Sequence, residues 1–340
     1  MFRFRGDRAR EEARRFAPGL ALLVLVGGVA RLVADAVPGA NHLLLAIVAG
    51  VVLANAVGVP EWAEPGVATH GLLLGAGIVL MGARISLAAV VDAGLQLLVL
   101  VLAVVAFTLV LTELLARTAF GLRGSLASLL AAGLSICGVS AVVAVAGGIR
   151  AEGEDVTYVV ATVLLVDAVT LFLYPLAGGL LDLSARTFGL WAGVSMLSTG
   201  PVAAAGFAYA DVAGQWAVVT KLTRNVLIGV VVVVYSVCYL RPSASDVRGS
   251  LRQLWVTFPK FVLGFVAMAV VANAGLLSEA RISHLTNAYR WCFLFAFAGL
   301  GLDVRLSKLR AAGLRPASVA FLTLCIASAV ALAAVTVLFG

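Results

Sequence analysis

The stretch VSMLSTGPVAAAGFAY, residues 194–209, places hydroxyls, a glycine and a proline inside an apolar run of membrane-spanning length. Proline lacks a backbone N–H and disfavours helix at the residue before it, so we predict that the helix breaks near Gly200 and Pro201. A helix restarting at Pro201 or Val202 would place Ser198 or Thr199 near its N-cap, where hydroxyl side chains are favoured. The segment therefore predicts an interrupted helix.

A second stretch, GLSICGVSAVVAVAGG at residues 133–148, has the same character. Unwound backbone at membrane depth persists only where it is buried in protein or lines a watery cavity. The N-terminus of a half-helix presents free N–H groups and a partial positive charge to that cavity. Close packing of helices through small residues is the alternative reading. We expect substrate contacts from both stretches, at Ser135, Cys137, Gly138, Ser140, Ser198, Thr199, Gly200 and Pro201.

Composition defines the class of protein. Of 340 residues, 62% are hydrophobic and only 12% are charged, which indicates an all-α polytopic membrane protein. Apolar runs of about 20 residues predict eleven transmembrane helices within a single transporter domain, 1–340, after a cytoplasmic lead-in at 1–16. The expected spans are 17–36, 42–58, 68–84, 91–116, 125–148, 156–181, 188–208, 214–240, 256–275, 287–303 and 315–338.

Basic residues predict the orientation of these spans, because cytoplasmic loops carry an excess of Lys and Arg. With the N-terminus in the cytoplasm, the opposite face receives the acidic stretch AEGED at 151–155 and Asp211. The net charge of +7 fits this bias and gives no reason to expect nucleic acid as a partner. The basic loops expected on the cytoplasmic face contain Arg117, Arg123, Arg241, Arg248, Arg252, Lys260, Arg305, Lys308, Arg310 and Arg315.

Two short passages indicate an internal repeat. LMGARIS at 80–86 resembles GLDVRLS at 301–307, and seven spans separate them in the predicted topology. An odd offset would make the two copies point in opposite directions, as inverted repeats of secondary transporters do. Chance similarity between short apolar segments is the alternative.

Two cations lie deep within a predicted span. In VVTKLTRNVLIGVVVVVYSV, residues 218–237, Lys221 and Arg224 share one helical face with Asn225. A charge at the centre of a membrane helix costs about 2.5–3.5 kcal/mol, so such residues ordinarily have a partner or a function. Asp167, in the middle of its own span, is a candidate partner.

One carboxylate cannot neutralise two cations, so we expect an electropositive pocket that binds an anion through Lys221 and Arg224. A purely structural pair of Asp167 with either cation is the alternative. Asp167 and Asn225 are the residues expected to couple transport to Na⁺ or H⁺.

Several chemistries are not supported. Four scattered cysteines and three distant histidines form no metal-binding pattern, so we expect no metal and no cofactor. Phosphate-binding, metalloprotease and serine-hydrolase motifs are missing from the sequence, so we expect no enzyme.

At these same segments the chain resembles the sulfate-exporter family of the YeiH type. The similar stretches are GLSICGVSAVVAV (133–145), ATVLLVDAVTLFLYP (161–175), FGLWAGVSMLSTGPVAAAG (188–206) and VVTKLTRNVLI (218–228). The resemblance implies inverted repeats with two discontinuous crossing helices, as in bile-acid symporters and sodium–proton antiporters. It also implies export of a sulfate-like anion across the cell membrane.

The chain departs from the family pattern at two places. Leu197 and Ser198 stand where a His-Asp pair is usual, and Asp167 stands where an Asn is usual. The expectation is a secondary transporter, in the exporting direction, for a small inorganic or sulfur-containing anion. An anion channel and a sodium- or proton-coupled organic anion transporter are the alternatives, and a homo-oligomer in the lipid bilayer is left open.

Overall fold

The computed structural model describes residues 3–37, 40–239, 259–309 and 313–339, and the regular structure in these ranges is helical. The chain forms two compact units that interleave in sequence. Unit 1 comprises Met1–Leu87 and Phe261–Leu306, and unit 2 comprises Ala88–Lys260 and Ser307–Gly340. The predicted basic residues Arg241, Arg248, Arg252 and Arg310 lie outside the described residues.

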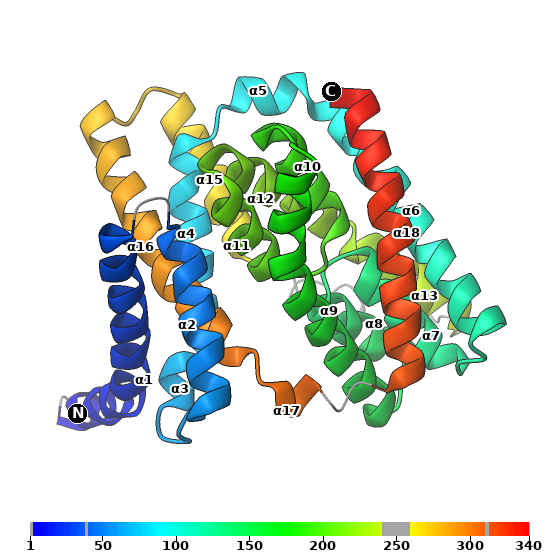
Figure 1. The fold of residues 1–340 in the computed structure, drawn as a ribbon, viewed down its shortest axis with the longest axis horizontal. Helices are drawn as coiled ribbons and strands as arrows, with labels where there is room; N and C mark the ends of the chain where they lie inside the picture. The colour runs from blue at the N-terminus through cyan, green and yellow to red at the C-terminus, as the bar shows by residue number, and fades with distance from the viewer. Residues whose placement is uncertain (1–2, 38–39, 240–258, 310–312, 340) are drawn as a thin grey trace. The chain divides into compact units, whose positions relative to one another are not determined.

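Unit 1 is a bundle of packed helices (Figure 1). Glycines let their backbones approach closely: a Cβ atom on Gly50 would lie 2.5 Å from the carbonyl oxygen of Ala298, and one on Gly82 would lie 2.6 Å from that of Phe265. Its elements are α1 (Arg3–Ala36), α2 (His42–Ala56), α3 (Glu64–Val67), α4 (His70–Met81), the 3₁₀ turn η1 (Gly82–Arg84), α15 (Phe261–Asn273) and α16 (Glu279–Asp303).

Unit 2 contains the segments in which the sequence predicts breaks. Its elements are α6 (Gly94–Leu114), the π-helical turn η2 (Leu115–Ala119), α7 (Gly124–Ser135), α8 (Val139–Ile149), α9 (Gly153–Leu180), α10 (Ala185–Ser195), α11 (Thr199–Tyr209), α12 (Asp211–Asn225), α13 (Ile228–Tyr239) and α18 (Leu314–Phe339). The short helices α5 (Leu87–Asp92) and α17 (Leu306–Leu309) begin where the chain passes from unit 1 to unit 2.

Helices α7 and α8 form a re-entrant hairpin, hairpin 1 (residues 124–149). The Ser125 hydroxyl, in the first turn of α7, donates a hydrogen bond to Asp155, in the first turn of α9. In the last turn of α8, at the same end of the hairpin, Gly148 packs against Ser236 in the last turn of α13. A continuous helix of this length would separate its ends by more than 30 Å. The two arms therefore fold back on each other and leave at the end where they entered.

Helices α10 and α11 form a second such structure, hairpin 2 (residues 185–209). The rings of Phe188 and Tyr209, one in each arm, stack with centroids 4.0 Å apart. The Tyr209 hydroxyl also donates to the carbonyl oxygen of Leu183, just before α10 begins. Hairpin 2 thus also enters and leaves unit 2 at one end.

These hairpins correct the predicted topology. The helices do break near Gly138 and Gly200, but segments 125–148 and 188–208 turn back and do not cross as spans. The acidic stretch 151–155 consequently lies at the same end of unit 2 as Arg123, whose guanidinium is 4.0 Å from the Glu152 carboxylate. Reading apolar length alone cannot distinguish a broken span from a hairpin of equal length.

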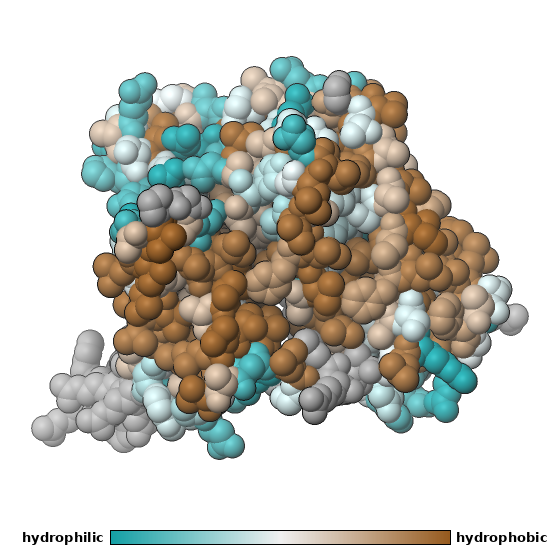
Figure 2. Space-filling model, in the orientation of Figure 1, coloured by the Kyte–Doolittle hydropathy of each residue, from teal (hydrophilic) through white to brown (hydrophobic). Residues whose placement is uncertain are grey.

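Several helices have the dimensions of membrane spans. Within the described residues, six are long and apolar enough by length and composition: Arg15–Ala36, Glu64–Arg84, Gly94–Ala119, Gly153–Leu180, Asp211–Tyr239 and Leu314–Phe339. Figure 2 shows hydrophobic side chains over α2 and α18, where Val52 and Val337 are exposed. Large exposed apolar side chains on such helices fit lipid as the surrounding solvent. The protein is a helical membrane protein.

Candidate functional site

The tips of the two hairpins meet inside unit 2. Helix α7 ends at Ser135 and α8 begins at Val139, and the turn between them includes Gly138 with φ +67° and ψ −129°. This conformation favours glycine, because a Cβ atom is disfavoured at positive φ. A Cβ atom on Gly138 would also lie 2.3 Å from the Ser198 hydroxyl oxygen at the tip of hairpin 2. The glycine therefore permits the close contact between the tips.

The tip of hairpin 2 differs slightly from the prediction. The break falls at residues 196–198, before the expected Gly200–Pro201, and α11 begins at Thr199 with Ser198 as its N-cap. Pro201 is buried at the third position of α11, within the first turn, where its missing N–H has no intrahelical partner to lose. The expected cap position is confirmed, although the Ser198 side chain makes no capping hydrogen bond to this helix.

The two tips share a sequence pattern that our sequence reasoning missed. GLSICG at 133–138 matches GVSMLS at 193–198 at its first and third residues and is apolar at its second, fourth and fifth residues in both copies. The signal was available as a Gly-x-Ser repeat within two segments already chosen for their small residues. In both copies this pattern ends the first arm of the hairpin and forms its tip.

Lys221 links the two tips. Its Nζ donates to the carbonyl oxygen of Ile136 in hairpin 1 at 2.6 Å and to that of Met196 in hairpin 2 at 3.0 Å. The side chain is completely buried, at 0% exposure. Helix C-termini carry a partial negative charge and unpaired carbonyl oxygens, so a cation is well matched to the ends of α7 and α10.

Arg224 does the same with more contacts. Its guanidinium donates to the carbonyl oxygens of Leu134 (2.7 Å), Ser135 (2.6 Å) and Met196 (2.7 Å), and the residue is 1% exposed. The planar fork of arginine can satisfy several acceptors at once. Backbone carbonyl oxygens at the hairpin tips therefore account in part for two cations at this depth. The two cations stabilise the ends of the first arms of both hairpins.

Asp167 faces the N-terminus of a helix, whereas Lys221 and Arg224 face the C-termini of helices. Its Oδ1 accepts a hydrogen bond from the Ser198 backbone N–H, 3.1 Å away, at the N-terminus of α11. Among the described residues, no ion pair within 4.0 Å joins Asp167 to Lys221 or Arg224. The alternative of a direct structural pair is therefore wrong for this structure. The carboxylate instead faces the positive end of a helix.

Asn225 completes the group beside hairpin 2. Its Nδ2 donates to the Thr199 hydroxyl oxygen at 3.3 Å, and the residue is 1% exposed. Its Oδ1 is buried and has no hydrogen-bond partner within the described part of the chain. A buried acceptor without a donor is costly, so this oxygen is available to a proton donor or a cation.

The remaining predicted residues divide into buried and accessible sets. The Ser135 hydroxyl donates to the Ala132 carbonyl oxygen at 3.4 Å, and Cys137 is buried. In contrast, Ser140 is exposed, and Thr199 and Gly200 are half-buried. Ser140, Thr199 and Gly200 thus have accessible surface at the first turns of α8 and α11, whereas Ser135, Cys137, Lys221 and Arg224 are buried.

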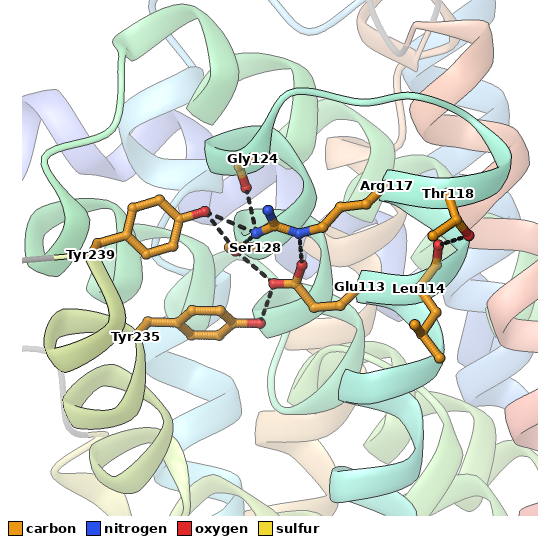
Figure 3. A network of polar contacts seen from close by, with 8 residues as sticks. All are labelled: Glu113, Leu114, Arg117, Thr118, Gly124, Ser128, Tyr235 and Tyr239. Atoms are coloured by element: carbon orange, nitrogen blue, oxygen red, sulfur yellow. Dashed lines mark hydrogen bonds and ion pairs between the residues drawn. The ribbon is translucent and has the colours of Figure 1, made fainter.

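The outer end of hairpin 1 is fixed by a polar network that the sequence reasoning did not identify (Figure 3). The Glu113 carboxylate accepts from Arg117, from the Ser128 hydroxyl at 2.6 Å and from the Tyr235 hydroxyl at 2.8 Å. The Tyr239 hydroxyl is 3.1 Å from the Arg117 guanidinium. The only available signal was the Glu113–Arg117 spacing of four residues. The network joins α6, α7 and α13.

Metal ligands do not cluster in the described ranges: no group of three or more His, Cys, Asp or Glu residues there could hold a metal ion. The arrangement is instead made of helix ends, two cations, one carboxylate and hydroxyl groups. It defines a polytopic membrane protein with two opposed re-entrant hairpins around a buried charged centre.

The chain belongs to the family described as "conserved hypothetical protein 698", which matches residues 18–320. It is 36% identical to a UPF0324 membrane protein of Nitratidesulfovibrio vulgaris over 332 residues, covering 94% of this chain and 92% of that protein. It is 31% identical to the UPF0324 inner membrane protein YeiH of Escherichia coli over 310 residues, covering 88% of each chain. No solved structure matches.

Proposed function

We propose that this protein is a secondary transporter that exports a small inorganic or sulfur-containing anion across the cell membrane by alternating access. The observation that carries the proposal is the meeting of two opposed hairpin tips at Lys221 and Arg224. Broken helices near the centre of a membrane protein form the substrate sites of many secondary transporters. The contact between Gly138 and Ser198 favours such a transporter over an open channel.

The charge balance of this centre supports an anionic substrate. Each hairpin contributes one helix C-terminus and one helix N-terminus, whose partial charges are opposite and nearly equal. The two positive charges of Lys221 and Arg224 exceed the one negative charge of Asp167, so the centre carries one excess positive charge. In a site of low dielectric, an uncompensated charge is costly, and a bound anion would neutralise it.

The accessible groups indicate where the anion would bind. Lys221 and Arg224 donate to backbone carbonyl oxygens and are sealed from solvent, so we now assign them an electrostatic role. Direct contacts would come from the N–H groups at the first turns of α8 and α11, with the hydroxyls of Ser140 and Thr199. Helix N-termini are favourable anion sites for this reason.

The coupling ion would bind at Asp167 and Asn225. Asp167 is buried without a cation within 4.0 Å, and the Asn225 Oδ1 has no partner among the described residues. A proton on Asp167 would raise the excess positive charge of the site and so strengthen anion binding. This linkage would couple proton binding to anion binding.

A thermal-shift screen of the purified protein tests binding. Sulfate, sulfite, thiosulfate, phosphate and chloride are compared on the wild type, Thr199→Val and the control Thr157→Val, whose hydroxyl bonds only within α9 in the described contacts. A ligand at 100 times its Kd should stabilise the protein by about 2.7 kcal/mol. We expect stabilisation that Thr199→Val loses and Thr157→Val keeps. Equal stabilisation of all three proteins would place the anion elsewhere.

Flux in proteoliposomes tests transport and coupling. Asp167→Asn keeps the acceptor for the Ser198 N–H but cannot carry a titratable charge. We expect the wild type to move the anion faster under a pH gradient and Asp167→Asn to lose this dependence. Gradient-dependent flux in Asp167→Asn would contradict the role of Asp167, and unitary currents would instead show a channel.

A further inference from the structure

Two asparagines in unit 1 make the same unusual set of hydrogen bonds. Asn55, near the end of α2, donates from Nδ2 to the carbonyl oxygen of Val304 at 2.8 Å and accepts at Oδ1 from the N–H of Leu306 at 2.8 Å. Its Nδ2 also donates to the carbonyl oxygen of Val51 at 2.8 Å, one turn back in α2. The amide therefore holds a short segment immediately after α16 (Asp303 is the last residue of that helix).

Asn273 repeats each of these bonds at the other end of unit 1. At the end of α15, its Nδ2 donates to the carbonyl oxygen of Ile85 at 2.8 Å, and its Oδ1 accepts from the N–H of Leu87 at 3.1 Å. Its Nδ2 also donates to the carbonyl oxygen of Ala269 at 2.8 Å, one turn back. Both donors of each amide are thus used, and this fixes the amide orientation.

The glycine contacts around these asparagines show the same correspondence, in which α2 contacts α16 as α15 contacts α4. A Cβ atom on Gly301 would meet the Ile47 carbonyl oxygen of α2, as one on Gly82 would meet that of Phe265 in α15. Helix α2 runs parallel to α16, and α15 runs parallel to α4, as their successive contacts show. Helices α4 and α16 are antiparallel, since Gly77 meets Phe293 while Gly299 meets His70.

These relations identify an inverted repeat within unit 1, in which α2–α4 corresponds to α15–α16. The stretches LMGARIS and GLDVRLS lie at equivalent places in this repeat, but the residue pairing that their resemblance suggested is not the structural register. Because Ile85 and Val304 are the matched acceptors, Arg84 corresponds to Asp303, whereas the sequence comparison paired it with Arg305. A shift of two residues separates the structural register from the sequence alignment.

The two asparagines lie where the chain leaves unit 1. Unit 1 ends at Leu87 and again at Leu306, which are the residues whose N–H groups the two asparagines hold. We infer that Asn55 and Asn273 are a symmetric pair of anchors that fix both exits of the chain from unit 1. Movement of unit 2 during transport would then flex the chain beyond Leu87 and Leu306, in addition to the return connection between Lys260 and Phe261, so the inference rests on the proposed function.

The two exits are held unequally. Beside Asn55, Arg305 pairs with Glu64 at 2.7 Å and Asp303 lies 3.5 Å from His70. The Arg305–Glu64 ion pair and the contact of His70 with Asp303 continue to hold the exit after α16 when the Asn55 amide is removed. We therefore expect the larger effect from loss of Asn273.

Hydrogen–deuterium exchange of the purified protein tests the anchors without reference to transport. Asn55→Ala should speed exchange of the peptide over residues 304–309 about 2- to 10-fold, as expected for loss of one net hydrogen bond. Asn273→Ala should do so for residues 85–92, and each variant should leave the other peptide unchanged. The control is Asn41→Ala, which removes the N-cap of α2, where Asn41 accepts from the N–H of Leu43. If each variant changed the exchange of both peptides equally, or of neither, Asn55 and Asn273 would not be anchors.

Spin-label distances test the flexing beyond Leu87 and Leu306. Labels at Leu72→Cys in unit 1 and Leu180→Cys in unit 2, both exposed, would be placed in a Cys238→Ser/Cys325→Ser background. We expect the distance distribution to broaden in Asn273→Ala more than in Asn55→Ala and to stay narrow in Asn41→Ala. Faster exchange with unchanged distributions would contradict flexing at these exits. Failed anion flux with broadened distributions would overturn the proposed function alone.

Discussion

The roles of single residues at this site depend on which backbone groups they face. The cost of burying charge in a membrane helix predicted that Lys221 and Arg224 have a partner or a function. Their carbonyl partners were not predictable, because those oxygens belong to residues 134–136 and 196, whose side chains give no indication of the bond. A sequence shows side chains, whereas this centre is built largely from helix ends.

Gly138 offers the sharpest test at this scale. Gly138→Ala should lower the Tm, because alanine at φ +67° costs about 1–2 kcal/mol and its Cβ atom would clash with the Ser198 hydroxyl. The control Gly179→Ala, in the last turn of α9 with open space around it, should not lower the Tm. Thermal melts measure both, and equal melts for the two variants would show that the tips need not touch.

At the scale of the element, hairpin 1 depends on groups at both of its ends. Its tip is held by Lys221 and Arg224, and its outer end is held by Glu113 through Ser128. The breaks in both hairpins were predictable from proline, glycine and serine. The return of each second arm was not, because it depends on contacts such as Ser125 with Asp155 that are 30 residues apart.

Removing one hydroxyl should loosen the outer end selectively. Tyr235→Phe deletes the donor to Glu113, so the peptide over residues 124–135 should exchange amide hydrogens about 2- to 10-fold faster. Thr118→Val is the control, because the Thr118 hydroxyl bonds to the Leu114 carbonyl oxygen outside this network. Unchanged exchange in Tyr235→Phe would mean that the remaining contacts of Glu113 are sufficient.

At the scale of the whole molecule, the hairpins change the predicted sidedness of loops. Hydropathy and charge correctly indicated the class of protein and most helix positions, including α2, α6 and α9. They assigned residues 151–155 to the face opposite Arg117 and Arg123, because a hairpin counted as a span reverses every following loop. Counting spans is therefore reliable only when the ends of each apolar segment are known.

Cysteine accessibility can verify this sidedness in intact cells. In a Cys238→Ser/Cys325→Ser background, Arg123→Cys and Glu152→Cys should react with a membrane-impermeant thiol reagent from the same face. Asp182→Cys, at the other end of the 28-residue α9, should react from the opposite face. Labelling of Arg123→Cys and Glu152→Cys from different faces would restore hairpin 1 as a span.

The charged centre also constrains the order of biogenesis. When α12 first enters the bilayer, Lys221 and Arg224 lack the carbonyl oxygens of both tips, and each charge costs about 2.5–3.5 kcal/mol at the helix centre. Hairpin arms of 11 and 12 residues are too short to insert as independent spans. Docking of the tips onto α12 must follow synthesis of α12, which comes after both hairpins in the chain. Docking also supplies the carbonyl acceptors that offset the cost of inserting Lys221 and Arg224, so burial of these two charges favours assembly of the centre.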